Sequence, residues 1–163
     1  MVEFTSEWLA LIEEDPKGGQ LAALYRHSLI VIERRPLLKA LMTQDKRVLG
    51  DFFRRQDTAM FARRNGFSLE FVRLLQSVGV VRPDLDPKRV AYMLNCMKAG
   101  MVFVDELMPV DNILPLEEAF DTVADFIERA FAPEGGGDSE VGKLVIRSID
   151  SALQERWAKG ELL

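Results

Sequence analysis

The sequence has few of the residues that build covalent or metal-bound sites. It contains one cysteine, Cys96, and one histidine, His27, in 163 residues. A single cysteine excludes an internal disulfide, and one cysteine with one histidine provides too few ligands for a zinc site. Phosphate-binding loops, metal-ligand clusters and nucleophile elbows are also missing. We therefore expect no metal, no cofactor and no enzymatic activity, and we interpret His27 as a surface or hydrogen-bonded core residue.

Long apolar runs are missing too. No stretch approaches the roughly 18 consecutive apolar residues that indicate a membrane span. The start, Met1-Val2-Glu3-Phe4, lacks the basic residues and apolar segment of a secretion signal. With 48% hydrophobic and 29% charged residues, the composition is that of a soluble globular protein. We therefore expect a cytoplasmic protein without membrane contact.

The net charge of −5 is unevenly distributed. Residues 1–15 hold five acidic and no basic side chains, residues 16–89 hold fifteen basic and seven acidic, and residues 90–163 hold six basic and fourteen acidic. The three parts therefore carry −5, +8 and −8. The arginine pairs of the basic part lie near the ends or outer faces of predicted helices, where cations are favourable without a ligand. We interpret them as solvated surface rather than as a DNA-contacting face.

Helical signals run along nearly the whole chain, and no segment shows the alternation of a strand. The expected helices cover about 5–15, 16–34, 36–43, 45–64, 68–78, 86–108, 115–132 and 139–163. Asp15 and Pro16 suit the N-cap and first position of the second helix, whereas Gly18 and Gly19 weaken that start and favour one nearer Gln20. The sequence therefore predicts an all-α bundle. We expect residues 1–132 to form one domain, the glycine-rich 133–138 a flexible linker, and 139–163 a separate C-terminal helix.

The most specific signal lies in residues 79–108. Gly79 suits the left-handed residue that follows a helix, and Asp86 with Pro87 suits the N-cap and first position of the next one. Two apolar stripes follow on that helix: Val90, Leu94, Met97, Met101, Val104 and Met108 on one, and Tyr92, Cys96, Ala99, Phe103 and Leu107 on the other. A helix that is apolar on two sides is expected to pack against other protein surfaces on both of them. We expect one stripe to face the interior and the other to face a partner.

Soft apolar side chains are abundant, with seven methionines and ten phenylalanines. They fill a core in the simplest interpretation, since methionine adapts to irregular gaps. The alternative is a cavity between helices, lined by apolar side chains and a few polar groups. The candidate ligand-binding residues are Tyr25, Ser28, Phe52, Phe53, Gln56, Met60, Phe71, Met93, Cys96, Met97 and Met101. Asn95 is a further polar candidate, although Asn95 and Lys98 also mark the most polar side of their helix.

A second surface is indicated by the helices expected at 86–108 and 115–132. Ala99 and Gly100 are small enough to let a neighbouring helix approach closely, and the second helix is broadly apolar. Two such pairs related by a two-fold axis would form an isologous four-helix interface. The expected interface residues are Ala99, Gly100, Phe103, Leu107, Phe120, Val123 and Ile127.

From about residue 20 to residue 132 the chain resembles the C-terminal, ligand-sensing half of TetR-type transcriptional regulators. The resemblance rests on residues 33–38 (ERRPLL), on residues 79–87 (GVVRPDLDP) and on the final amphipathic helix pair. It implies a homodimer formed through the last two helices and a small hydrophobic effector bound between the others. The helix-turn-helix of that family has no counterpart before residue 20, so contact with DNA would need a reading domain outside this chain.

Two function classes follow from these observations. One is an effector-sensing and dimerisation domain of a TetR-like regulator. The alternative is a helical protein-interaction module without a small-molecule ligand. An enzyme would require a buried pair of titratable groups facing a cleft, and the sequence gives no signal for one.

Overall fold

The computed structural model describes residues 2–36, 40 and 67–160. Every regular element in these ranges is helical, which confirms the all-α prediction. The elements are α1 (Val2–Glu14), α2 (Leu21–Glu33), α6 (Leu69–Ser77), α7 (Pro87–Leu107), η2 (Val110–Asn112), α8 (Leu116–Phe131), η3 (Glu134–Gly136) and α9 (Ser139–Ala158). The helix expected at 45–64, most of the helix expected at 36–43, and Phe52, Phe53, Gln56 and Met60 lie outside the described residues.

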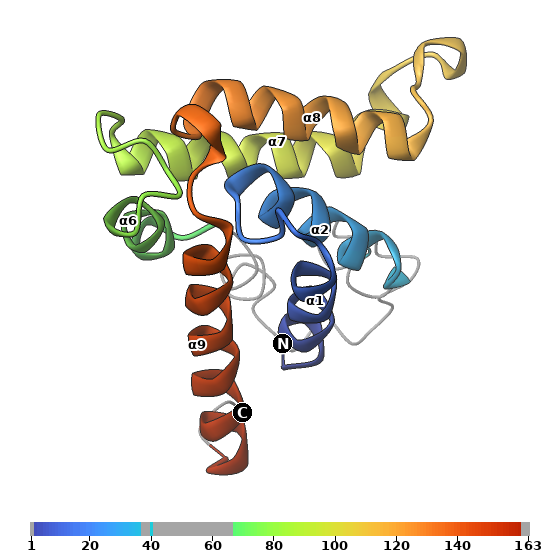
Figure 1. The fold of residues 1–163 in the computed structure, drawn as a ribbon. Helices are drawn as coiled ribbons and strands as arrows, with labels where there is room; N and C mark the ends of the chain where they lie inside the picture. Colours follow the sequence, from blue (N-terminus) through green and yellow to red (C-terminus); the bar gives the residue numbers. More distant parts are fainter. Residues whose placement is uncertain (1, 37–39, 41–66, 161–163) are drawn as a thin grey trace.

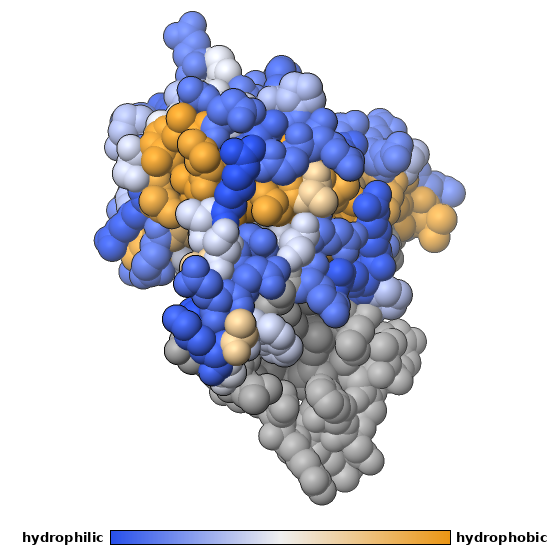
Figure 2. Space-filling view, turned by 60° about the horizontal axis from the view of Figure 1, so that its bottom comes forward, coloured by the Kyte–Doolittle hydropathy of each residue, from blue (hydrophilic) through white to orange (hydrophobic). Residues whose placement is uncertain are grey.

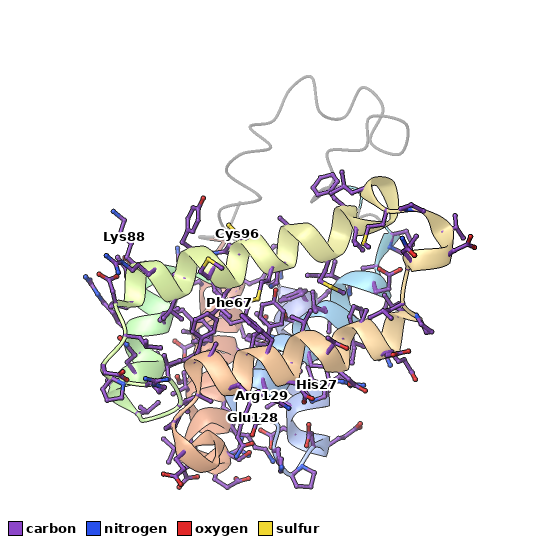
Figure 3. The ribbon with its side chains drawn as sticks, turned by 90° about the horizontal axis from the view of Figure 1, so that it is seen from above. His27, Phe67, Lys88, Cys96, Glu128 and Arg129 are labelled. Carbon is purple, nitrogen blue, oxygen red and sulfur yellow. The ribbon has the colours of Figure 1, made fainter. Side chains whose placement is uncertain are left out.

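Helix α2 packs on both α1 and α8, and α6 packs on both α7 and α9. Helices α7 and α8 run in opposite directions without close contact between their backbones (Figure 3), and α2 lies beneath them (Figure 1). Helix α9 leaves the end of α8 at a steep angle and runs beside α1 (Figure 1). The buried core draws on each of the α-helices in the described ranges, and its most buried members include Ile12, Leu24, Leu75, Leu94, Ile127 and Ile146. No described helix has the length and apolar character that crossing a membrane requires.

Several helix boundaries follow local signals. The Ser68 hydroxyl accepts a hydrogen bond from the Phe71 N–H at 3.1 Å, and Asp86 caps α7 by accepting from the N–H groups of Lys88 and Arg89. Gly79 has a φ of 75°, as the left-handed residue after α6 requires. These caps confirm the predicted ends of α6 and α7.

Two boundaries differ from the prediction. Helix α1 begins at Val2 rather than at Thr5 or Ser6, and Thr5 is buried inside it. Helix α2 begins at Leu21, because residues 15–20 form a turn in which Gly18 N–H donates to the Asp15 carbonyl. The start expected at Asp15 and Pro16 is therefore wrong, and the alternative start near Gln20 is confirmed.

The glycine-rich segment 133–138, whose composition predicts a flexible linker, forms a turn that contacts Gln20. The side-chain amide of Gln20 donates to the carbonyls of Gly135 and Gly137, at 3.2 and 3.1 Å. Gly136 is buried between them. These bonds fix the path from α8 into α9, so the C-terminal helix is joined closely to the rest of the chain.

Helix α9 packs on α1 rather than standing apart. Arg147 forms a two-point ion pair with Glu13, and Ser6 on α1 hydrogen-bonds to both Asp150 and Gln154. Val145 and Ile146 belong to the common core. The division between residues 1–132 and 139–163 is therefore not visible in the packing of the described residues.

The start of α9 touches the 15–20 turn through two glycines. A Cβ atom placed on Gly142 would overlap the Gly19 carbonyl, and one placed on Gly19 would overlap the Ser139 carbonyl. The Gly19 N–H also donates to the Ser139 hydroxyl at 3.1 Å. Only glycine at these two positions allows the backbones to meet so closely.

Gly142→Ala is expected to lower the free energy of unfolding by roughly 1–3 kcal/mol, because the added methyl group forces the turn and α9 apart. The matched control is Ser151→Ala, at an exposed position of the same helix, which should change stability by at most about 0.5 kcal/mol. Urea denaturation followed by circular dichroism measures both. Equal stability of the Gly142→Ala variant and the parent would contradict the close backbone contact.

Candidate ligand-binding cavity

The two apolar stripes of α7 have different surroundings, as predicted. On the first stripe Val90 and Leu94 are buried, and Met97 and Met101 pack against the core. On the second stripe Tyr92 and Leu107 are 69% and 77% exposed. Cys96 and Ala99 are exposed as well, and Phe103 is half-buried. One side of α7 therefore faces the interior and the other faces away from it.

A cavity of about 380 Å³ lies between α2, the second half of α7 and the first half of α8. Its volume is within the range of small-molecule sites. Most of its lining side chains are apolar: Leu29, Ile32, Met101, Val104, Met108, Ile113, Leu114, Leu116, Ala119, Phe120 and Val123. Three are polar: Glu33, Asn112 and Thr122. Such a lining favours a predominantly hydrophobic ligand with few polar groups.

The inner end of the cavity is held by the packing of α2 and α8. Phe120 and Ile127 of α8 are buried in the core, as are Leu29 and Ile32 of α2. Arg26 and Asp121 join the two helices by an ion pair at 2.5 Å. The Thr122 hydroxyl donates to the Glu118 carbonyl within α8, so its oxygen retains accepting capacity. The inner wall is therefore built from two firmly packed helices.

Of the predicted ligand-binding residues, Met101 lines this cavity. Tyr25 and Ser28 are buried elsewhere on α2: the Tyr25 hydroxyl donates to the Leu94 carbonyl at 3.1 Å, and the Ser28 hydroxyl donates to the Tyr25 carbonyl. Both hydroxyls are therefore occupied by backbone acceptors. Burial also raises the pKa of Tyr25, which keeps the phenol protonated.

The other described candidates do not converge on the cavity. Phe71 and Met97 pack against the core. Met93 is 42% exposed and Cys96 is exposed, because both lie on the outward side of α7. Figure 3 shows Cys96 at the edge of α7. These candidates lie on different sides of α7, because apolar character alone does not indicate which side of a helix faces the interior.

The predicted interface residues also fall into two groups. Ala99, Gly100 and Leu107 are exposed and Phe103 is half-exposed, so they are accessible to a partner. Phe120 and Ile127, in contrast, are 6% and 0% exposed, and Val123 lines the cavity. Phe120 and Ile127 are therefore covered within one chain and Val123 is half-buried at the cavity, so the surface that α8 offers to a partner is not the predicted one.

Sequence reasoning missed the environment of Asn95 and Lys98. The Asn95 side chain accepts from the Phe67 N–H at 2.9 Å and donates to the Phe67 carbonyl at 2.8 Å. It thereby holds the chain at the start of α6 against α7. The polar side of α7 is thus partly buried, although the sequence suggests a solvated one.

Lys98 lies beneath this contact and is only 3% exposed. Its Nζ is 4.8 Å from the centre of the Phe67 ring and 5.9 Å from the centre of the Tyr25 ring, and the two rings stack on each other. No carboxylate of the described residues forms an ion pair with it. Burial lowers the pKa of Lys98 to about 7, since charge is unfavourable there.

His27 is part of a hydrogen bond that holds the 15–20 turn. Its Nε2 lies 2.9 Å from Asp15 Oδ2, while its Nδ1 is buried without a partner among the described residues. Burial by itself would raise the pKa of Asp15, but the hydrogen bonds from His27 and from the Lys17 N–H outweigh it and lower that pKa. His27 does not line the cavity, so the pair supports the turn and α2.

Comparison of the chain with protein-family models, with curated proteins and with solved structures gave no match.

The buried amine gives a pH-dependent stability. Because the folded pKa of Lys98 is about 7 against an ordinary 10.5, the unfolded chain binds more protons between these values. The free energy of unfolding should therefore rise between about pH 7.5 and 9.5, by up to roughly 1.4 kcal/mol per pH unit. Lys98→Met should remove this rise, whereas Lys88→Met, at an exposed position of the same helix, should retain it. Urea denaturation across this pH range measures how the free energy of unfolding changes with pH. An equal change in the two variants would contradict the lowered pKa of Lys98.

Proposed function

We propose that this chain is an effector-binding and dimerisation domain of a TetR-like transcriptional regulator. The observation that carries the proposal is the apolar cavity of about 380 Å³ between α2, α7 and α8. A small hydrophobic effector bound there would contact α2, α7 and α8 together. Its binding would therefore bias how α7 and α8 are positioned on the rest of the domain.

The proposed dimer uses the outward side of α7. Helices α7 and α8 run along one surface of the molecule (Figure 3). On α7 that outward side exposes Tyr92, Cys96, Ala99, Gly100 and Leu107. On α8, Phe126 is 53% exposed. Exposed apolar side chains on each of these two helices favour an isologous contact with a second copy. DNA would be read by a domain outside this chain.

A protein-interaction module without a small ligand is the second candidate. It is favoured by apolar side chains exposed away from α7, such as Leu74 of α6 and Leu144 and Trp157 of α9. Figure 2 shows apolar surface at the end of the molecule where α6 lies. The two candidates differ in whether the cavity binds a ligand.

Ligand binding can be tested with the hydrophobic fluorophore N-phenyl-1-naphthylamine. We expect its emission to rise with the parent protein, and Met101→Trp to lower its affinity at least tenfold, because the indole fills the cavity. Met93→Trp is the matched control on the exposed side of the same helix and should bind like the parent. Circular dichroism checks that all three are folded. Equal binding by the Met101→Trp variant and the parent would place the dye elsewhere and count against the effector site.

The dimer can be tested with Gly100→Trp. The position is exposed, and a Cβ atom added there meets nothing within 4 Å, so one chain tolerates the substitution. At an interface the indole would hold the helices apart and weaken dimerisation at least tenfold. Ser151→Trp on α9 is the control and should leave dimerisation unchanged. Sedimentation equilibrium should give twice the chain mass of 18.5 kDa for the parent and control. A parent that remains monomeric, or a Gly100→Trp variant that dimerises like the parent, would contradict this interface.

A further inference from the structure

The connection between α7 and α8 forms one wall of the cavity. We call residues 109–114 the strap; it runs from Pro109, after the end of α7, to the residue before Pro115, the N-cap of α8. The strap contributes Asn112, Ile113 and Leu114 to the lining. It projects beyond the ends of both helices (Figure 1). Part of the site is therefore formed by a short connection and not by a packed helix.

The mouth of the cavity lies at this strap. Lining residues at the inner end, such as Leu29 and Phe120, are 2% and 6% exposed. Those beside the strap are much more open: Met108, Leu114 and Leu116 are 43%, 46% and 46% exposed. Solvent therefore reaches the lining from the strap and the start of α8.

The strap is held mainly by bonds within itself. The Asn112 N–H donates to the Pro109 carbonyl at 2.9 Å, and the Ile113 N–H donates to the Val110 carbonyl at 3.2 Å. In the described part of the chain, no other hydrogen bond and no ion pair joins residues 109–114 to a helix. Val110 is 83% exposed. Segments with so few anchors open locally at low cost in free energy.

The wall that α2 and α8 form is fixed more firmly. Helices α2 and α8 are joined by the Arg26–Asp121 ion pair and by the buried side chains of Phe120 and Ile127. Moving α8 away from α2 would expose these apolar side chains to water, at about 25 cal/mol for each Å² uncovered. Moving the strap exposes much less apolar surface, since Val110 and Leu114 are already in contact with solvent.

Because the strap has few anchors whereas α2 and α8 are packed together, we propose that the strap is the gate of the cavity. A hydrophobic ligand passes between the strap and the start of α8, and Ile113 and Leu114 then close over it. Opening of the strap sets the rates of both entry and exit. The gate rests on the proposed effector site, and it adds the route by which the ligand reaches that site.

The test is stopped-flow fluorescence with N-phenyl-1-naphthylamine and strap variants that leave the cavity lining intact. Pro109→Gly and Val110→Gly change residues outside the lining and loosen the strap. Both should raise the association and dissociation rate constants together by about two- to fivefold, while Kd stays nearly constant. The matched control is Pro83→Gly, the same substitution in an exposed turn between α6 and α7, which should leave both rate constants unchanged.

The outcomes separate the gate from the effector site. Binding that Met101→Trp abolishes, combined with unchanged rate constants in both strap variants, would overturn the gate and leave the effector site standing. Equal acceleration by Pro83→Gly would also overturn the gate. Binding that persists in the Met101→Trp variant would overturn the effector site, and the gate with it. Faster rates in the two strap variants alone would support the gate.

Discussion

The packing of α2 at the centre of the chain is the constraint on which the rest of the structure depends. Its side chains Leu21, Leu24, Leu29 and Ile32 are almost fully buried. Neighbouring helices attach to it by different means: the Trp8 indole of α1 donates to the Leu24 carbonyl, and the Tyr25 hydroxyl donates to the backbone of α7. Because α8 packs closely on α2 while the second half of α7 lies farther off, an apolar space remains among the three helices. The proposed effector site follows from that arrangement.

Local signals in the sequence were sufficient for the starts of α6 and α7 and for the two-sided character of α7, although not for the start of α1. Caps such as Ser68 and Asp86 act within one helical turn, so residue type and spacing determine them. The apolar stripes of α7 are likewise a property of one helix, and their periodicity correctly separated the buried Leu94 from the exposed Tyr92.

The features that could not be predicted from the sequence depend on contacts between segments that are distant along the chain. Asn95 and Lys98 suggest a solvated side, yet they are covered because Phe67 of another segment packs there. The composition of residues 133–138 predicts a flexible linker and gives no sign of the hydrogen bonds that Gln20 donates to their carbonyls. Phe120 and Ile127 were assigned to a partner, but α2 of the same chain covers them. Periodicity identifies an apolar side without identifying what lies against it.

The most direct test of the central claim is a methyl NMR titration with N-phenyl-1-naphthylamine, using protein labelled at the methionine ε-methyl groups. The chain contains seven methionines, so the spectrum can be assigned by single substitutions. A ligand in the cavity should shift the resonances of Met101 and Met108 and leave that of the outward-facing Met93 unchanged. Shifts at Met93 with unaffected Met101 and Met108 would show that the dye binds the outer side of α7, and the account of an internal effector site would be wrong.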